Sequence, residues 1–154
     1  MGRPFRIERS IQISASPEAV FAVAADLARW NDWSPYFRAA PETAFTVSSP
    51  SNGVGALYTW EGRKAGSGRM EITSQVPDQS VTLRLEFFAP FKAVNQTDFS
   101  CAPAPGGGTR FTWAMSGDRP WFMVVMAFLF RLDRMLAGQF DEGLQMLKGV
   151  VERA

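Results

Sequence analysis

The segment PWFMVVMAFLFRLDRMLAGQFDEGLQMLKGVVER, Pro120 to Arg153, decides the fold of this chain. Apolar residues recur in it every three or four positions, as an amphipathic helix requires. The helix predicted from this pattern has about 33 residues and is about 50 Å long at 1.5 Å per residue. Such a helix can cover an entire curved sheet. The apolar positions are Phe122, Met126 or Val125, Leu129, Leu132, Leu136, Phe140, Leu144, Leu147 and Val151.

The first part of this segment, residues 120–130, is apolar on every side of the predicted helix. It is too short to span a membrane, which takes about 20 apolar residues, and Arg131 ends it. A helix that is apolar all round is buried all round or contacts something besides its own sheet. Three interpretations stay open: burial beneath the aromatic segment 30–37, a dimer or membrane-surface patch, and one wall of a ligand pocket.

The rest of the chain alternates between apolar and polar residues with a period of two, which predicts strands. The first strand covers Phe5 to Ile13, and further strands fall at 45–47, 56–60, 68–72, 81–87, 91–101 and 111–115. After the first strand, Ser16 is placed to cap a short helix that has Pro17 at its first position. An aromatic turn or second short helix follows at 30–37. Gly, Pro, Asn and Asp separate the later strands, which is typical of an antiparallel meander.

The two faces of the predicted sheet differ. One face carries side chains of both charges together with neutral polar ones, which is the ordinary pattern of a solvated sheet face. Its residues are Arg69, Glu71, Arg84, Glu86, Gln96, Asp98, Arg110 and Thr112. The other face is apolar and aromatic, and the C-terminal helix is the element available to cover it. A curved sheet wrapped around one helix rarely fills its own concavity, so we expect a small-molecule pocket there. Tyr58, Asn95 and Thr97 are the polar groups on this face that could orient a ligand.

Composition excludes several kinds of chemistry. The chain has no histidine and one cysteine, Cys101, so it has neither a Ser-His-Asp triad nor a disulfide framework. We expect no metal and no cofactor. The 16 basic and 15 acidic residues nearly balance without a basic cluster, which disfavours a nucleic-acid partner. The N-terminal MGRPFRIERSIQIS lacks the apolar stretch of a signal peptide, so a cytoplasmic location is expected, without a transmembrane segment.

Three stretches together resemble a known family. They are SASPEAVFAVAADLARWNDWSP (14–35), GVGALYTWEGRKAGSGRMEI (53–72) and FDEGLQMLKGVVE (140–152). The chain resembles the START-like, or SRPBCC, superfamily, particularly its bacterial polyketide cyclase/dehydrase-like branch, along nearly its whole length. The resemblance implies one domain, 1–154, of class α+β with the helix-grip fold. In this fold a curved antiparallel sheet of seven strands wraps around the long C-terminal helix, and two short helices follow the first strand.

The resemblance also implies a deep hydrophobic cavity between sheet and helix. Carried over position by position, its ligand-binding residues would be Trp33 and Phe37 near the mouth. Deeper walls would come from Tyr58, Trp60, Met70, Phe87, Asn95, Phe99, Trp113 and Met115, and from Phe122, Met126 and Phe130 on the helix.

Three functional hypotheses follow. The first is a binder of a small hydrophobic, lipid- or polyketide-like molecule that acts as a carrier or sensor. The second is a polyketide cyclase/dehydrase-type enzyme in the same cavity, in which Tyr58, Asn95 or a buried carboxylate such as Asp133 polarises the substrate. The third is an interaction module that dimerises through 120–130. The expected oligomeric state is therefore a monomer or a homodimer, and no catalytic residue is assigned.

Overall fold

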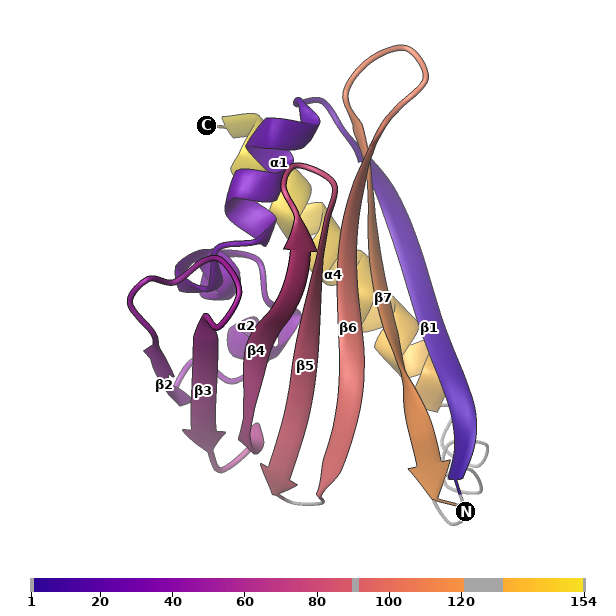
Figure 1. Cartoon of the computed structure of the whole chain (residues 1–154). Coiled ribbons are helices and arrows are strands. Elements are labelled where there is room, and N and C mark those ends of the chain that lie inside the picture. Colours follow the sequence, from indigo (N-terminus) through magenta and orange to yellow (C-terminus); the bar gives the residue numbers. More distant parts are fainter. Residues whose placement is uncertain (1, 90–91, 121–131, 154) are drawn as a thin grey trace.

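Seven antiparallel strands form one curved sheet that lies across a long C-terminal helix (Figure 1). The computed structural model describes residues 2–89, 92–120 and 132–153. The strand order is β1-β7-β6-β5-β4-β3-β2, so the first strand pairs with the last and the other strands form a meander. This confirms the predicted helix-grip fold. The strands are β1 (Gly2–Ile13), β2 (Ala44–Val47), β3 (Leu57–Gly62), β4 (Gly66–Val76), β5 (Ser80–Ala89), β6 (Ala93–Pro103) and β7 (Thr109–Pro120).

Three short helical segments connect β1 to β2, and a side chain caps each of them. They are α1 (Pro17–Ala24), the 3-10 helix η1 (Leu27–Asp32) and α2 (Pro35–Ala39). Ser16 accepts a hydrogen bond from the Ala19 amide at 3.1 Å, and Asp26 accepts one from the Ala28 amide at 3.0 Å. Ser34 accepts one from the Phe37 amide at 3.2 Å. Each side chain satisfies a backbone donor that the first helical turn leaves without a partner.

The described part of the C-terminal helix, α4 (Leu132–Arg153), follows the apolar stripe that the sequence predicts. Phe140, Leu144, Leu147 and Val151 are buried on it. The predicted start of the helix at Pro120 is wrong, because β7 includes this residue through its pairing with Gly2. Residues 121–131 lie outside the described residues, and so does the apolar surface for which we left three interpretations open. No helix among the described residues is long and apolar enough to cross a membrane.

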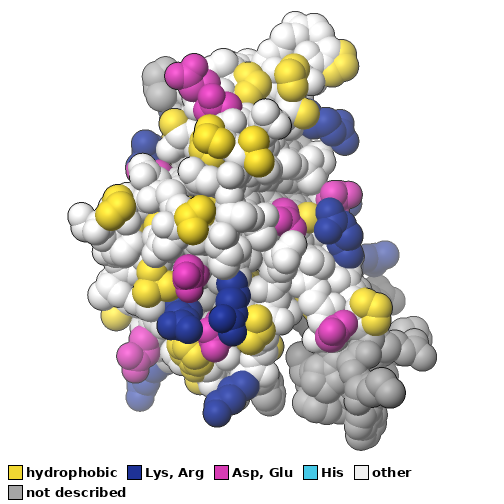
Figure 2. Space-filling view, viewed as in Figure 1, with side chains coloured by type: hydrophobic (Ala, Val, Ile, Leu, Met, Phe, Trp, Pro, Cys, Tyr) yellow, Lys and Arg dark blue, Asp and Glu magenta, His cyan; other side chains and the backbone are white. Residues whose placement is uncertain are grey.

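The outer face of the sheet carries basic and acidic side chains close together, as predicted (Figure 2). Arg69 on β4 pairs with Glu86 on β5 at 3.0 Å. Thr82 donates to Asp98 at 2.7 Å on the next pair of strands. Such cross-strand partners are expected on a solvated sheet face, and these carboxylates are therefore part of its surface.

An aromatic cluster fills part of the space between the sheet and α4. The Trp113 ring on β7 stacks on the Phe140 ring of α4, with centroids 4.0 Å apart and planes 8° apart. Trp33 packs edge-on against Trp113 and against Trp30, with centroid distances of 5.5 and 4.7 Å. Phe99 of β6 contacts Trp30, Trp33 and Trp113. Aromatic pairs prefer these edge-to-face and stacked arrangements, so the cluster holds the sheet, η1 and the helix together.

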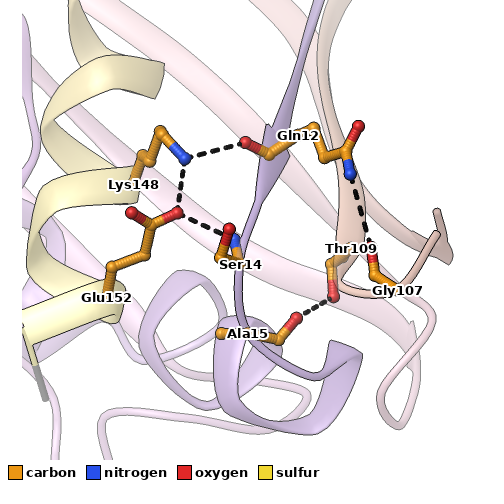
Figure 3. Close-up of polar contacts among 7 residues, drawn as sticks. All are labelled: Gln12, Ser14, Ala15, Gly107, Thr109, Lys148 and Glu152. Carbon is orange, nitrogen blue, oxygen red and sulfur yellow. Dashed lines mark hydrogen bonds and ion pairs between the residues drawn. The ribbon is translucent and has the colours of Figure 1, made fainter. Parts of the chain in front are cut away.

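Polar contacts tie the C-terminal end of α4 to the end of β1, and β7 to the segment that follows β1 (Figure 3). Glu152 accepts a hydrogen bond from the Ser14 amide at 2.7 Å and pairs with Lys148, whose ammonium group also donates to the Gln12 carbonyl at 3.3 Å. The Lys148 ammonium group and the Ser14 amide hold the pKa of Glu152 below its ordinary value. Thr109 donates to the Ala15 carbonyl at 2.7 Å. These contacts fix where the helix ends relative to the sheet.

Two glycines of α4 give opposite predictions for the same substitution. A Cβ on Gly143 would lie 2.8 Å from the Trp113 ring, 3.0 Å from Pro35 and 3.3 Å from the Trp33 carbonyl oxygen. A Cβ on Gly138 would meet nothing within 4 Å among the described residues. We expect Gly143→Ala to lower the free energy of unfolding by about 1–3 kcal/mol through overpacking. Gly138→Ala should raise it by up to about 1 kcal/mol through helix propensity.

Urea denaturation of the two variants beside the unmodified protein measures both changes. Equal and positive changes would show that the helix does not approach the aromatic cluster as closely as described.

Candidate functional site

A cavity of about 430 Å³ lies between α2, the inner face of the sheet and α4. This volume is within the range of about 300–1,000 Å³ that small-molecule sites occupy. Its wall is mostly aromatic and aliphatic, with a few hydroxyl groups. The described residues that line it are Trp30, Ser34, Tyr36, Phe37, Ala39, Ala40, Thr43, Tyr58, Trp60, Lys64, Ala65, Met70, Leu85, Phe87, Thr97, Phe99, Trp113, Met115, Leu136 and Phe140.

Most of the residues expected to line a cavity do so. The period of two brings inward-facing side chains from five strands to one surface, because alternate residues of a strand share a face. The predicted site residues on this wall are Phe37, Tyr58, Trp60, Met70, Phe87, Phe99, Trp113 and Met115. Whether they bind a ligand stays a prediction.

Two of the expected positions are not on the wall. Trp33, expected near the mouth, has no exposed surface and lies inside the aromatic cluster; its indole N–H has no hydrogen-bond partner among the described residues. Asn95, expected to orient a ligand, is half-buried on β6. Its amide oxygen lies 2.4 Å from the point where a Cβ of Gly117 would stand. The space left by this glycine on β7 holds the amide beside the neighbouring strand, away from the cavity.

The helix positions Phe122, Met126 and Phe130 lie outside the described residues, and so does the side chain of Asp133. Their proposed contributions to a ligand site or to catalysis therefore stay predictions.

The site residues that we did not predict come mainly from the connection between β1 and β2. The cavity is reached by Trp30, Ser34 and Tyr36, because η1 and α2 lie on the inner side of the sheet, the side that also faces α4 (Figure 1). Leu136 and Phe140 belong to the apolar stripe that the sequence shows on the C-terminal helix, so their spacing was the available signal. No pattern distinguishes a stripe residue that packs on the sheet from one that faces a void.

Gly68 on β4 shapes one side of the cavity. A Cβ at this position would lie 2.5 Å from the Trp60 ring and 2.4 Å from the Glu86 carbonyl oxygen. The Trp60 indole therefore lies flat against the strand, where its N–H donates to the Ala65 carbonyl at 3.3 Å. Glycine in a strand commonly marks such a close approach.

Three hydroxyl groups in the wall already have partners. Tyr58 donates to the Asn31 side-chain oxygen at 2.6 Å, and Thr43 donates to the Ala40 carbonyl at 2.7 Å. Ser34 accepts from the Phe37 amide as the cap of α2. Burial raises the pKa of Tyr58 to about 12, against a smaller opposing effect of the hydrogen bond to Asn31. Burial also raises the pKa of Tyr36 well above 10. Both phenols are therefore protonated at neutral pH and suited to donate hydrogen bonds, not to act as bases.

The described wall contains no carboxylate, and its charged side chain is Lys64, which is exposed on the hairpin between β3 and β4. Among the described residues, no group of three or more acidic or cysteine side chains is placed to hold a metal ion. Apolar surface with neutral hydroxyl groups is suited to hold a largely apolar molecule. It offers little for general acid–base catalysis.

The comparisons with known proteins agree with this geometry. Residues 4–152 match the profile of the family described as polyketide cyclase / dehydrase and lipid transport. Because the match spans nearly the whole chain, the protein belongs to this family, and the resemblance seen in the sequence is confirmed. No match was found among curated proteins.

Solved structures with the same fold include proteins of several kinds. The aromatase/cyclase Zhui from Streptomyces sp. R1128 is 15% identical with a TM-score of 0.69, over 98% of this chain and 95% of that one. A Staphylococcus aureus protein of unknown function is 15% identical with a TM-score of 0.70, over 99% and 96%. A Mesorhizobium loti protein is 18% identical with a TM-score of 0.66, over 99% and 98%. At these identities the likeness shows the fold alone.

The raised pKa values of Tyr36 and Tyr58 give a direct test, because the chain has only these two tyrosines. We expect Tyr58 to stay protonated at pH 10.5 in the folded protein, so that at most one of the two tyrosines contributes tyrosinate absorbance there. In the unfolded chain both tyrosines titrate near pH 10. Because folding raises these pKa values, the contribution of the neutral phenols to the free energy of unfolding is complete below pH 10. It is lost as the pH rises from 10 through about 12.

Spectrophotometric titration in buffer and in guanidinium chloride measures the difference. Ionisation of both tyrosines near pH 10 in the folded protein would show that Tyr58 is not buried in the apolar wall.

Proposed function

We propose that this protein binds a small, largely apolar, ring-containing molecule in the cavity between its sheet and α4. In this proposal it acts as a cytoplasmic carrier or sensor of that molecule. The observation that carries the proposal is a cavity of about 430 Å³ whose described wall is aromatic and aliphatic and holds no carboxylate. The family description, which includes lipid transport, supports it. The free thiol of Cys101 is compatible with a reducing compartment.

The size of the cavity bounds the ligand. A water molecule occupies about 30 Å³ in the liquid. If each non-hydrogen atom of a ligand takes the same volume, a cavity of 430 Å³ holds about fourteen such atoms. This corresponds to two or three fused rings. At roughly 0.5 kcal/mol per atom, within the usual range for ligands, the binding free energy is about 7 kcal/mol. The dissociation constant is then of the order of 10 µM.

A cyclase-type enzyme acting in the same cavity is the second candidate. The family description and the shared fold of the aromatase/cyclase Zhui support it. The described wall supplies hydroxyl groups that could hold a carbonyl oxygen, and no described group in it is suited to take up a proton at neutral pH. Binding without chemistry therefore fits the described residues better. Dimerisation through 120–130 stays a prediction, since those residues lie almost entirely outside the described ones.

A cavity-filling substitution tests the proposal. Leu85→Trp places a large ring in the wall, opposite Met70 on the neighbouring strand. We expect it to weaken binding of the neutral three-ring fluorophore 1-aminoanthracene at least tenfold, because the added ring occupies the ligand's volume. The matched control is Val94→Trp, which adds the same ring at a position 50% exposed on the adjacent strand.

Fluorescence titration gives the affinities, and circular dichroism confirms that each variant is folded. Equal affinity in the Leu85→Trp and Val94→Trp variants would place the probe outside this cavity and contradict the proposal.

A further inference from the structure

Thr97 carries a hydroxyl group in the cavity wall that has no hydrogen-bond partner among the described residues. It lies in the middle of β6, opposite Leu83 on β5 and Met115 on β7, and is only 4% exposed. Its side chain forms no hydrogen bond with another described residue, unlike the hydroxyl groups of Tyr58 and Thr43. Its oxygen is not one of the buried side-chain atoms that lack a partner, so it is accessible from the cavity. A polar group in such a place is normally satisfied by water or by a bound molecule.

Valine has the same shape as threonine and is at least as well suited to the centre of a strand. A threonine among apolar neighbours therefore gives the empty protein no advantage over valine. It gives an advantage when a molecule in the cavity offers a hydrogen-bonding group to the hydroxyl.

The group that meets Thr97 has to be uncharged. Thr97 pairs with Leu83, which pairs with Ile72, six residues along β4 from Gly66. Lys64, the charged residue of the described wall, lies beyond Gly66 on the hairpin between β3 and β4. Among the described residues, a carboxylate beside Thr97 would thus have no cation next to it, and burying such a charge costs far more than one hydrogen bond returns. A hydroxyl or carbonyl group has no such cost.

We infer that the cavity selects ring compounds that carry an uncharged hydroxyl or carbonyl group at the end bound next to Thr97. This inference rests on the proposed function, because it assigns the chemical class of the ligand for the same cavity. The rings contact the aromatic wall formed by Phe99 and Trp113, and Thr97 discriminates between the oxygenated compound and the bare hydrocarbon.

Three probes with one ring system test this inference: 2-naphthol, naphthalene and 2-naphthoate. The two-ring body fits the volume of the cavity, and the three compounds differ in the presence and charge of one polar group. Equilibrium dialysis at pH 7 gives the dissociation constants. For the unmodified protein we expect 2-naphthol to bind about three- to tenfold more tightly than naphthalene, the usual effect of one hydrogen bond, and 2-naphthoate to bind more weakly than 2-naphthol.

Variants assign the difference to Thr97. Thr97→Val should reduce the preference for 2-naphthol over naphthalene to less than twofold, with naphthalene bound as tightly as before. Thr97→Ser keeps the hydroxyl group and should keep the preference. Thr112→Val is the matched control, because Thr112 bonds to Ser10 on the outer face of the sheet; it should change nothing.

The outcomes separate this inference from the proposed function. An unchanged preference for 2-naphthol in Thr97→Val, or tightest binding of 2-naphthoate by the unmodified protein, would overturn the role of Thr97 and leave the binding function in place. If neither the naphthalenes nor 1-aminoanthracene bind the unmodified protein, the proposed function fails, and this inference fails with it.

Discussion

The stacking of Trp113 on Phe140 is the contact on which the rest of this structure depends. The two rings lie 4.0 Å apart and nearly parallel, and they join the inner face of β7 to the middle of α4. Because the rings are this close, the helix needs a residue without a side chain at Gly143, where the Trp113 ring and the turn at Pro35 both approach it. Trp30, Trp33 and Phe99 then surround Trp113. The cluster includes Trp33, Phe99 and Phe140, which are among the largest fully buried side chains of the described residues, and the cavity lies beside it.

The cavity exists because the helix is fixed at two places and cannot move in to fill the space. Beyond the aromatic cluster, Lys148 and Glu152 hold the C-terminal end of α4 to the ends of β1 (Figure 3). Arg9 on β1 also forms two hydrogen bonds to Asp141, at 2.9 and 2.7 Å. Closing the void would require breaking these contacts or distorting the sheet. Protein interiors are close-packed, so a void of this size between fixed elements supports the proposed ligand site.

Much of the fold could be predicted from the sequence, because it depends on repeated local patterns. The period of two along the strands placed Tyr58, Phe99 and Trp113 on the inner face. The spacing of Phe140, Leu144 and Leu147 predicted the buried stripe of the helix. The predicted start of that helix at Pro120 was wrong, because proline is common in the first turn of a helix but is also tolerated at the margin of a sheet.

The cavity wall was less predictable, because it depends on side-chain volumes across elements that are distant in sequence. Trp33 and Trp30 stand in the same short aromatic segment, yet only Trp30 reaches the cavity. Asn95 lies at a position of β6 that belongs to the inner face. Its amide, however, occupies the space beside Gly117 on the neighbouring strand, which has no side chain there. Thr97 has the same parity as Asn95 and does face the cavity. The odd or even position of a residue in a strand decides on which face of the sheet its side chain lies. The side chains of the neighbouring strands decide which residues on that face line a cavity.

A native mass spectrum of the protein, purified gently from the cells that make it, tests the central claim most directly. The claim is that the space beside Trp113 and Phe140 holds a small apolar molecule. We expect a population of the folded chain with an added mass of about two to three hundred daltons, the size that about fourteen or more non-hydrogen atoms give, and we expect this mass to be lost on denaturation. A spectrum with the mass of the bare chain alone, before and after denaturation, would contradict the claim and indicate a cavity without a resident ligand.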